Sequence, residues 1–412
     1  MLSRRAFLSA LTAAACVPAG AARALSEKQR LEDFDALWSA IDQGYAYFGG
    51  ARADWRRARD GWRARARSAR TRPEFVAALE GALERLHDDH LWMSEHAPDS
   101  PRRVPAETDI WASWRSESAV IEAVRTYGDA DVAGLRPGHV VRSIAGLPAP
   151  MAVRDRIGAG ETAQVARDWA LRRALAGPRE GVLRVEVAEA QGPKAYDVER
   201  KRPAAANGPG LIGRRVGQQR DLGYVRLKAS LSDPAFVETF EGAIQYLAGT
   251  RAMILDLRDV TGPFDDPTRA RAATLAILQR FTTRPGPWQA RETRAGERLT
   301  DSIAARPGTY PAPLVVLVDR WTAGEGEALA AGLNAVAGAR LIGTRMAGLR
   351  GALQEARLPN SSITVRYPGQ KTFHPDGTPR EALRPEILVD LAAPQGGPGD
   401  PILYQGLKLL EK

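Results

Sequence analysis

The most restrictive feature of this sequence is the alternation of apolar runs and amphipathic helical patterns from residue 211 onward. The apolar runs that predict strands are "LGYVRL" (222–227), "AMILDLRD" (252–259), "PLVVLVD" (313–319) and "ARLIG" (339–343). The helical patterns between them cover 234–248, 269–281 and 326–337. Continuous apolar strands separated by helices are typical of an α/β layer with a largely buried sheet. We therefore predict an α/β core over residues 211–395, followed by a C-terminal tail with a short helix over 396–412.

The first 24 residues have the layout of an export signal. Arg4 and Arg5 precede an apolar stretch, and small residues close the segment at Ala24. This arrangement is typical of a twin-arginine signal peptide. We therefore expect an exported, periplasmic protein whose net charge falls from +9 to +6 when three arginines leave with residues 1–24.

The composition excludes several classes of chemistry and partner. The only cysteine of the 412-residue chain is Cys16, inside the signal, so the mature protein has no disulfide, thiol nucleophile or thiolate metal site. No later segment reaches the ~18 to 20 uncharged apolar residues of a membrane span, so we expect none after signal cleavage. We interpret the arginine-rich stretch at 54–72 as a solvated helix face, and we expect no nucleic-acid partner.

Two smaller domains are expected before the core. Apolar residues at spacings of three and four predict packed helices over residues 25–97: Phe34, Leu37, Trp38, Ile41 and Tyr45, and then Phe75, Leu79, Leu83 and Leu86. Residues 105–203 carry short β-prone runs and one helical stretch. Within them "VAGLRPGHVVRSIAG" (132–146) resembles the signature of PDZ domains, with His139 where aspartate is usual and no clear carboxylate-binding loop before it. A linker is expected at 201–210.

Several motifs occur in an order that resembles one enzyme family. They are "LHDDHL" (86–91), the PDZ-like module, "LGYVRL", "MILDLRDVTGP", "VLVDRWTAGEGEAL" and "HPDGTPREALRPEILVD". Over roughly residues 31–392 the chain resembles the tail-specific, or C-terminal processing, serine peptidases, including their tricorn-core-like branch. The resemblance implies an α/β, or α+β multidomain, protein: an N-terminal helical domain, a PDZ-like β domain and a Clp protease/crotonase-like spiral α/β core. It also implies peptide or protein C-terminal tails as partners and no cofactor.

The same resemblance assigns roles to individual residues. His90 matches the general base, and an imidazole with an ordinary pKa near ~6.5 can take a proton from a hydroxyl and return it. Glu381 matches the acidic residue that helps to orient the site. Backbone N–H groups at Gly262 and Glu325 match the oxyanion site. No metal is expected, because the "HDDH" run lacks a third ligand cluster elsewhere.

The position of the nucleophile departs from the family pattern. Counting back three residues from Glu327 leads to Gly324, which has no side chain to attack a carbonyl. Thr322 carries a hydroxyl but stands two residues too early. Two further departures concern the loop after "LDLR", where Val260 replaces an asparagine and Pro263, which has no N–H to donate, replaces a glycine. Leu349 and Arg350 stand where a lysine base would be, and arginine keeps its proton.

Two hypotheses follow. The first is a serine peptidase that uses His90 and Glu381 with a nucleophile not recognised in the sequence. The second is a catalytically silent homologue that binds peptides or an apolar ligand on the same scaffold. A sugar- or nucleotide-binding protein is disfavoured, because "GTRMAGLRG" (343–351) lacks the Lys-Ser/Thr ending of a phosphate loop. The sequence does not indicate an oligomeric state.

Overall fold

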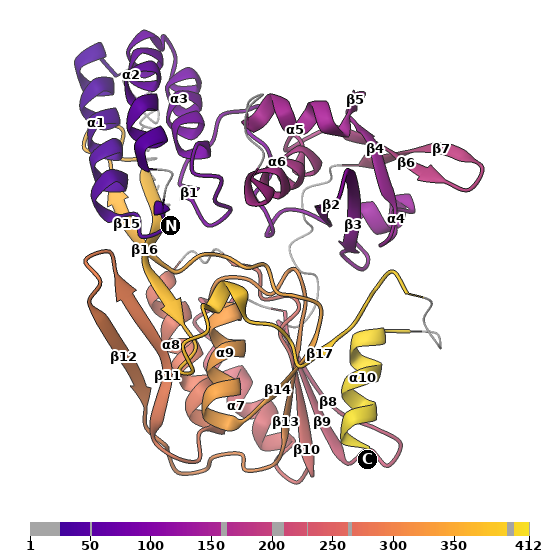
Figure 1. The fold of residues 1–412 in the computed structure, drawn as a ribbon. Coiled ribbons are helices and arrows are strands. Elements are labelled where there is room, and N and C mark those ends of the chain that lie inside the picture. The colour runs from indigo at the N-terminus through magenta and orange to yellow at the C-terminus, as the bar shows by residue number, and fades with distance from the viewer. Residues whose placement is uncertain are drawn as a thin grey trace, which may run out of the picture.

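The structure, a computed structural model, describes residues 25–49, 52–157, 163–199, 210–228, 230–262, 266–393 and 399–411. The chain forms a group of helices, a small β domain beside it, and a larger α/β part below both (Figure 1). The predicted export signal at residues 1–24 lies outside the described residues and stays a prediction.

Three helices form the first part: α1 (Glu27–Gly44), α2 (Arg52–Ser68) and α3 (Arg72–Glu84). The side chains of Ser26 and Thr71 cap α1 and α3 by accepting N–H groups of the first turn. The two apolar stripes predicted for α1 and α3 are buried in one common cluster, as expected.

Helix α2 is more than the solvated face that its arginines suggest. Trp55 is buried, and its ring stacks on Trp38 with the centroids 3.8 Å apart. Arginines of α2 pair with carboxylates of α1, for example Arg63 with Asp35 at 2.8 Å. The interpretation of 54–72 as surface is therefore wrong for Trp55, which belongs to the core.

The second part is an antiparallel sheet with the strand order β2-β3-β4-β6-β7 and β5 paired to β4. Its strands are β2 (Ile110–Arg115), β3 (Ser118–Val124), β4 (Val140–Ile144), β5 (Leu147–Pro148), β6 (Val182–Glu189) and β7 (Gly192–Glu199). Its helices are α4 (Asp129–Ala133), α5 (Ala149–Ile157) and α6 (Gln164–Ala176). Gly134, within the PDZ-like motif at 132–146, ends α4 with φ +102°. Residues 201–209 of the predicted linker lie outside the described residues.

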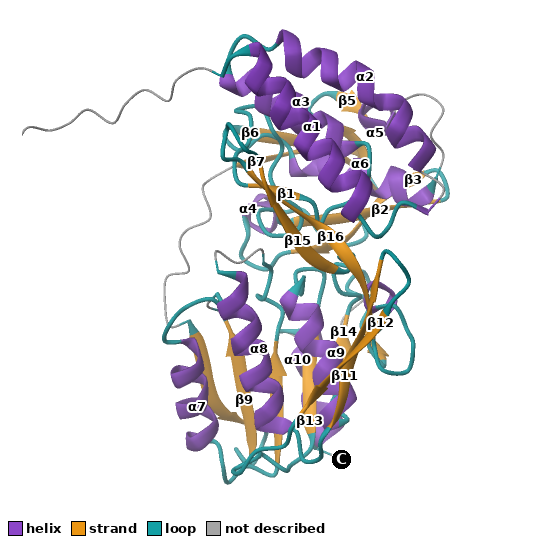
Figure 2. Cartoon of the chain, turned by 90° about the vertical axis from the view of Figure 1, so that its left-hand side faces the viewer, coloured by secondary structure: helices purple, strands orange, loops and turns teal. Residues whose placement is uncertain are grey.

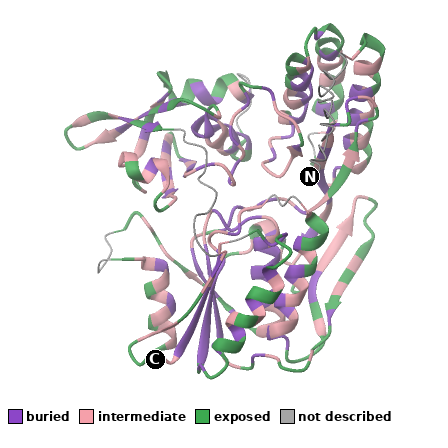
Figure 3. Cartoon of the chain, turned by 180° about the vertical axis from the view of Figure 1, so that it is seen from behind, coloured by how far each residue is buried: buried purple, intermediate pink, exposed green. Residues whose placement is uncertain are grey.

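The third part contains a six-stranded sheet with the order β17-β14-β13-β10-β9-β8. Its strands are β8 (Leu211–Val216), β9 (Leu222–Leu227), β10 (Ala252–Asp256), β13 (Leu314–Val318), β14 (Arg340–Gly343) and β17 (Ile387–Leu388). All pair in parallel except β8, which is antiparallel to β9. The helices are α7 (Phe236–Tyr246), α8 (Pro267–Phe281) and α9 (Glu325–Ala337). Every residue of β10 and β13 is buried (Figure 3), which confirms the predicted buried sheet.

A second sheet joins the α/β part to the helices. It has the order β1-β16-β11-β12, with β15 also paired to β16. Its strands are β1 (Trp92–Met93), β11 (Gly286–Thr293), β12 (Arg298–Ile303), β15 (Ala352–Arg357) and β16 (Thr364–Phe373). The β15–β16 hairpin extends between the helices and the α/β part (Figure 2), and its residues Leu358, Ile363 and Val365 are buried in the same cluster as Phe34. The helical domain predicted over 25–97 is thus completed by a distant hairpin.

The C-terminal segment belongs to the α/β part. Helix α10 (Pro401–Leu410) packs on β13 and β14, and Ile402 is buried against that face of the sheet. The tail predicted for 396–412 is therefore a covering layer of the core sheet. None of the described helices has the length and apolar character that a membrane span requires.

Candidate active site

Gly324 lies in the turn between the buried strand β13 and helix α9. Its backbone has φ +56° and ψ −112°, a conformation that glycine adopts easily and other residues adopt with strain. Sharp strand-to-helix turns of this kind present the nucleophile in many hydrolases. The N–H of Ala323 donates to the carbonyl of Val260 at 2.9 Å, which fixes the turn to the loop after β10. The chain therefore has a nucleophile turn whose apex carries no side chain.

The hydroxyl of Thr322 does not fill that gap. Thr322 is fully buried. Its hydroxyl donates to the carbonyl of Leu257 at 3.2 Å and accepts the N–H of Asp319 at 3.0 Å. The side chain therefore holds the turn together and is not available to a substrate.

His90 faces Gly324 from the loop that follows α3. A Cβ atom placed on Gly324 would lie 3.7 Å from Nε2 of His90. The Nδ1 atom of His90 lies 2.5 Å from the carbonyl oxygen of Arg350, so Nδ1 carries the hydrogen and donates it. Burial lowers the pKa of His90 to about 4, and the charge of Arg380 acts in the same direction. His90 is thus neutral at pH 7, and its unprotonated Nε2 lies close to the position where a side chain on residue 324 would begin.

Asp88 fixes the loop that carries His90. One carboxylate oxygen accepts the backbone N–H of His90 at 2.9 Å, and the other accepts the hydroxyl of Tyr45 at 2.7 Å. The guanidinium of Arg350 lies 3.5 Å from the same carboxylate and donates to the Tyr45 hydroxyl at 3.0 Å. Arg350 therefore holds His90 in place through both its side chain and its carbonyl, at the position where a lysine base was excluded.

Glu381 lies away from His90. It belongs to the short 3-10 helix η2 (Arg380–Ala382) and lines a second cavity, between the PDZ-like part and the core, near Arg320. The described hydrogen bonds include none between Glu381 and His90, and Oε2 of Glu381 is buried without a partner. The carbonyl of Arg350 occupies the place of an orienting carboxylate, so the role assigned to Glu381 stays a prediction.

The two predicted oxyanion positions lie beside the turn. Gly262 has φ +49° in the loop after β10, and Glu325 is the first residue of α9, whose opening N–H groups have no carbonyl partner within the helix. The side chain of Val260 is buried in the core and contributes no polar group to the site. Pro263, predicted to remove a donor, lies outside the described residues.

Glu327 is a site residue to which the sequence assigned no role. Its buried carboxylate accepts three backbone N–H groups: Gly324 at 3.0 Å, Gly348 at 2.8 Å and Leu349 at 3.2 Å. These bonds join the nucleophile turn to the loop that carries Arg350. Burial nevertheless raises the pKa of Glu327 to about 7, against the opposing charge of Arg380.

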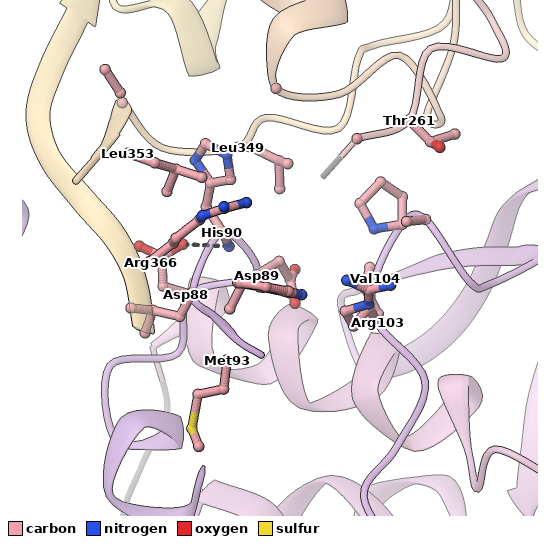
Figure 4. A pocket seen from close by; sticks show the side chains of 18 of the residues that line it. Asp88, Asp89, His90, Met93, Arg103, Val104, Thr261, Leu349, Leu353 and Arg366 are labelled. Atoms are coloured by element: carbon pink, nitrogen blue, oxygen red, sulfur yellow. Dashed lines mark hydrogen bonds between the residues drawn. The ribbon is translucent and has the colours of Figure 1, made fainter. Parts of the chain in front are cut away.

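These residues surround a cavity of about 530 Å³ between the helices and the α/β core. Figure 4 shows His90 between Leu349 and Asp88, with Arg103 and Val104 on another wall and Thr261 across from His90. Gly262, Gly324 and Glu325 also line the cavity. His90, Gly324 and the two predicted donor positions thus open into one cavity of ligand size.

The comparisons with known proteins concern the family and the fold. The sequence profile described as "Peptidase family S41" matches residues 221–389. The chain carries an S41 peptidase domain. A comparison with curated proteins gave no match.

Solved structures share the fold around this S41 domain over nearly the whole chain. The photosystem II D1 C-terminal processing protease is 17% identical, with 88% of this chain and 94% of that chain covered and a TM-score of 0.57. Mature CPAF is 15% identical, with 93% and 95% covered and a TM-score of 0.59. A lipoprotein from Streptococcus agalactiae is 10% identical, with 93% and 96% covered and a TM-score of 0.51. These likenesses confirm the predicted multidomain α/β fold.

The structure brings together four of the five predicted site residues at one cavity: Gly262, Gly324 and Glu325 from within the S41 match, and His90 from outside it. The missed residue Glu327 had a sequence signal, because a glutamate three residues after a helix start has the spacing of a capping box. The role of the Arg350 carbonyl had no sequence signal, because every residue has a main-chain carbonyl whatever its side chain. No group of three metal-ligating side chains occurs among the residues that the structure describes.

Glu327 should make the stability of the S41 domain depend on pH. Its carboxyl keeps the proton up to about pH 7 in the fold but loses it near the ordinary value of 4.5 when unfolded. The unfolded state then binds fewer protons between these values, so stability falls as pH rises. Relative to Glu327→Gln, the wild type should lose on the order of 2 kcal/mol of unfolding free energy over this window. Urea unfolding of both proteins at several pH values measures this, and a pH-independent difference would contradict it.

Proposed function

We propose that this protein binds the C-terminal tails of peptides or proteins in the cavity beside Gly324 and does not hydrolyse them through an acyl-enzyme. The supporting observation is the distance of 3.7 Å between His90 Nε2 and the Cβ position of a residue that has no side chain. A base that faces an empty apex can accept a proton, but no hydroxyl is present there to give one. Covalent serine catalysis requires that attacking group.

Other hydroxyls offer no replacement among the described residues. Thr322 is buried and bonded within the turn. Thr261 is the only hydroxyl-bearing residue that lines the cavity in the described part of the chain, and it stands across the cavity from His90 (Figure 4). Nucleophilic catalysis needs the hydroxyl and its base within about 2.6–3.2 Å, and no hydrogen bond joins these two residues.

The experiment measures binding and cleavage on the same samples. Peptides with apolar C-terminal residues are titrated into the wild-type protein, and their binding is measured by isothermal calorimetry. The masses of the same peptides are then determined by mass spectrometry. We expect saturable binding and peptides of unchanged mass, with no labelling of the wild type by a fluorophosphonate probe.

Two variants identify the catalytic residues if the wild type does cleave the peptides. Cleavage by the wild type that is lost in His90→Asn would contradict the proposal and show an active peptidase. If Thr261→Val also abolished that cleavage, Thr261 would be the nucleophile. Absence of both binding and cleavage would remove the tail-binding function as well.

A further inference from the structure

Arg380 is a buried cation in the wall of the cavity without a carboxylate partner. Arg380 belongs to η2 and is only 5% exposed. One terminal nitrogen donates to the carbonyl of Gly351 at 2.6 Å, whereas Nε is buried without any partner. Among the described residues no carboxylate lies within ion-pair distance of Arg380, and burying an unpaired charge is costly.

The other arginines that line the cavity are already paired with carboxylates. The pairs are Arg103 with Glu107, Arg173 with Glu84, Arg271 and Arg291 with Asp301, and Arg366 with Glu355. The carboxylates of the cavity have partners too: Arg350 lies beside Asp88, Arg172 binds Asp89, and Thr274 donates to Glu325. Arg380 is therefore the cation of this wall that is left to interact with a ligand.

A second source of positive potential faces the same space. Helix α9 has 13 residues, and its first residue, Glu325, lines the cavity next to Gly324. The N-terminus of a helix carries unpaired N–H groups and a partial positive charge, and it binds anions readily. The charge of Arg380 is felt in the same part of the cavity, because it acts to lower the pKa of His90 and of Glu327.

We infer that Arg380 and the N-terminus of α9 form a binding site for a carboxylate, and that its occupant is the C-terminal carboxylate of a bound peptide. This inference rests on the proposed function and adds which end of the ligand is recognised. Glycine at position 324 adds no side chain between the cavity and the first turn of α9, so a carboxylate can approach the start of the helix, where a peptidase would hold a scissile carbonyl.

The test compares one apolar-tailed peptide as the free acid and as the C-terminal amide, titrated into the wild type, Arg380→Gln and the matched control Arg366→Gln. Arg366 lines the same cavity but is already paired. We expect the wild type and Arg366→Gln to prefer the free acid by about tenfold or more, as a hydrogen bond to a charged group contributes. Arg380→Gln should bind both forms equally.

The outcomes distinguish a failure of the carboxylate site from a failure of the proposed tail binding. Equal binding of acid and amide by the wild type would overturn the carboxylate site and leave tail binding intact. Binding of neither form would overturn both. Octanoate serves as a free carboxylic acid, and if it bound as tightly as the peptide acid the site would belong to small acids. If Arg380→Gln does not fold, Arg380→Lys replaces it, and the preference should fall without vanishing because the charge remains but the planar fork is lost.

Discussion

Replacing Gly324 with serine should give a protein that reacts with a fluorophosphonate probe at least about a hundred times faster than the wild type. The new Cβ would lie 3.7 Å from Nε2 of His90, which leaves the hydroxyl within hydrogen-bond reach of a neutral imidazole. Burial already lowers the pKa of His90 to about 4, so the base is unprotonated at pH 7. The measurement is the rate of probe incorporation, followed by the cleavage of apolar-tailed peptides.

Two controls isolate the contribution of the hydroxyl. Gly324→Ala has the same strained backbone at φ +56°, which costs roughly 1–3 kcal/mol of stability, but it offers no nucleophile and should not label. Adding His90→Asn to Gly324→Ser should slow labelling by about 10²- to 10⁴-fold. If that double variant labelled as fast as Gly324→Ser, His90 would not be the base. A folded but inert Gly324→Ser protein would show that the vacated turn is not a functional nucleophile site.

Replacing Asp256 with alanine should destabilise the core by about 3–5 kcal/mol, the usual cost of removing one partner of a buried ion pair. Asp256 ends β10 and is fully buried. Its carboxylate accepts two nitrogens of the Arg258 side chain, at 2.8 and 2.6 Å, and the hydroxyl of Tyr224 at 2.8 Å. Arg258 also donates to Asp400, the N-cap of α10. Removing Asp256 should therefore also weaken the attachment of that helix. Urea unfolding followed by circular dichroism gives the free energy.

Asp197→Ala is the matched control for the loss of an ion pair. Asp197 and Arg184 are 3.5 Å apart on the surface of the PDZ-like part, and both side chains are more than half exposed. Exposed pairs contribute about 0–1 kcal/mol. The interpretation of Asp256 as a central buried anchor would be wrong if both variants lost a similar amount of stability.

The sequence predicted most readily what depends on local periodicity. Strand β13 is apolar throughout and β10 is apolar up to its last residue, Asp256, and this pattern predicted a buried sheet. The hairpin β11–β12 was not predicted, because its strands mix polar and apolar residues and it has one bulge in its register. The packing of the β15–β16 hairpin on the helices was not predicted, since its burial against α1 and α3 is a contact between residues far apart in the chain.

The same distinction holds at the site. The order of motifs was enough to pair His90 with Gly324, which the structure places in contact distance. It could not show that the backbone carbonyl of Arg350 would accept a hydrogen bond from Nδ1 of His90. Nor could it show that Arg380, an ordinary arginine in a polar loop, would be buried without a partner. Both facts depend on how the loops pack after the core has formed.

The β15–β16 hairpin also determines what can be cut from this chain. Residues 221–389, the extent of the S41 match, include Leu358, Ile363 and Val365, whose buried surfaces face α1 and α3. A fragment restricted to that range would expose this apolar hairpin to water and would lose α10 from one face of the core sheet. The smallest piece able to fold therefore has to extend beyond the family match and include helices α1 and α3, which cover the hairpin.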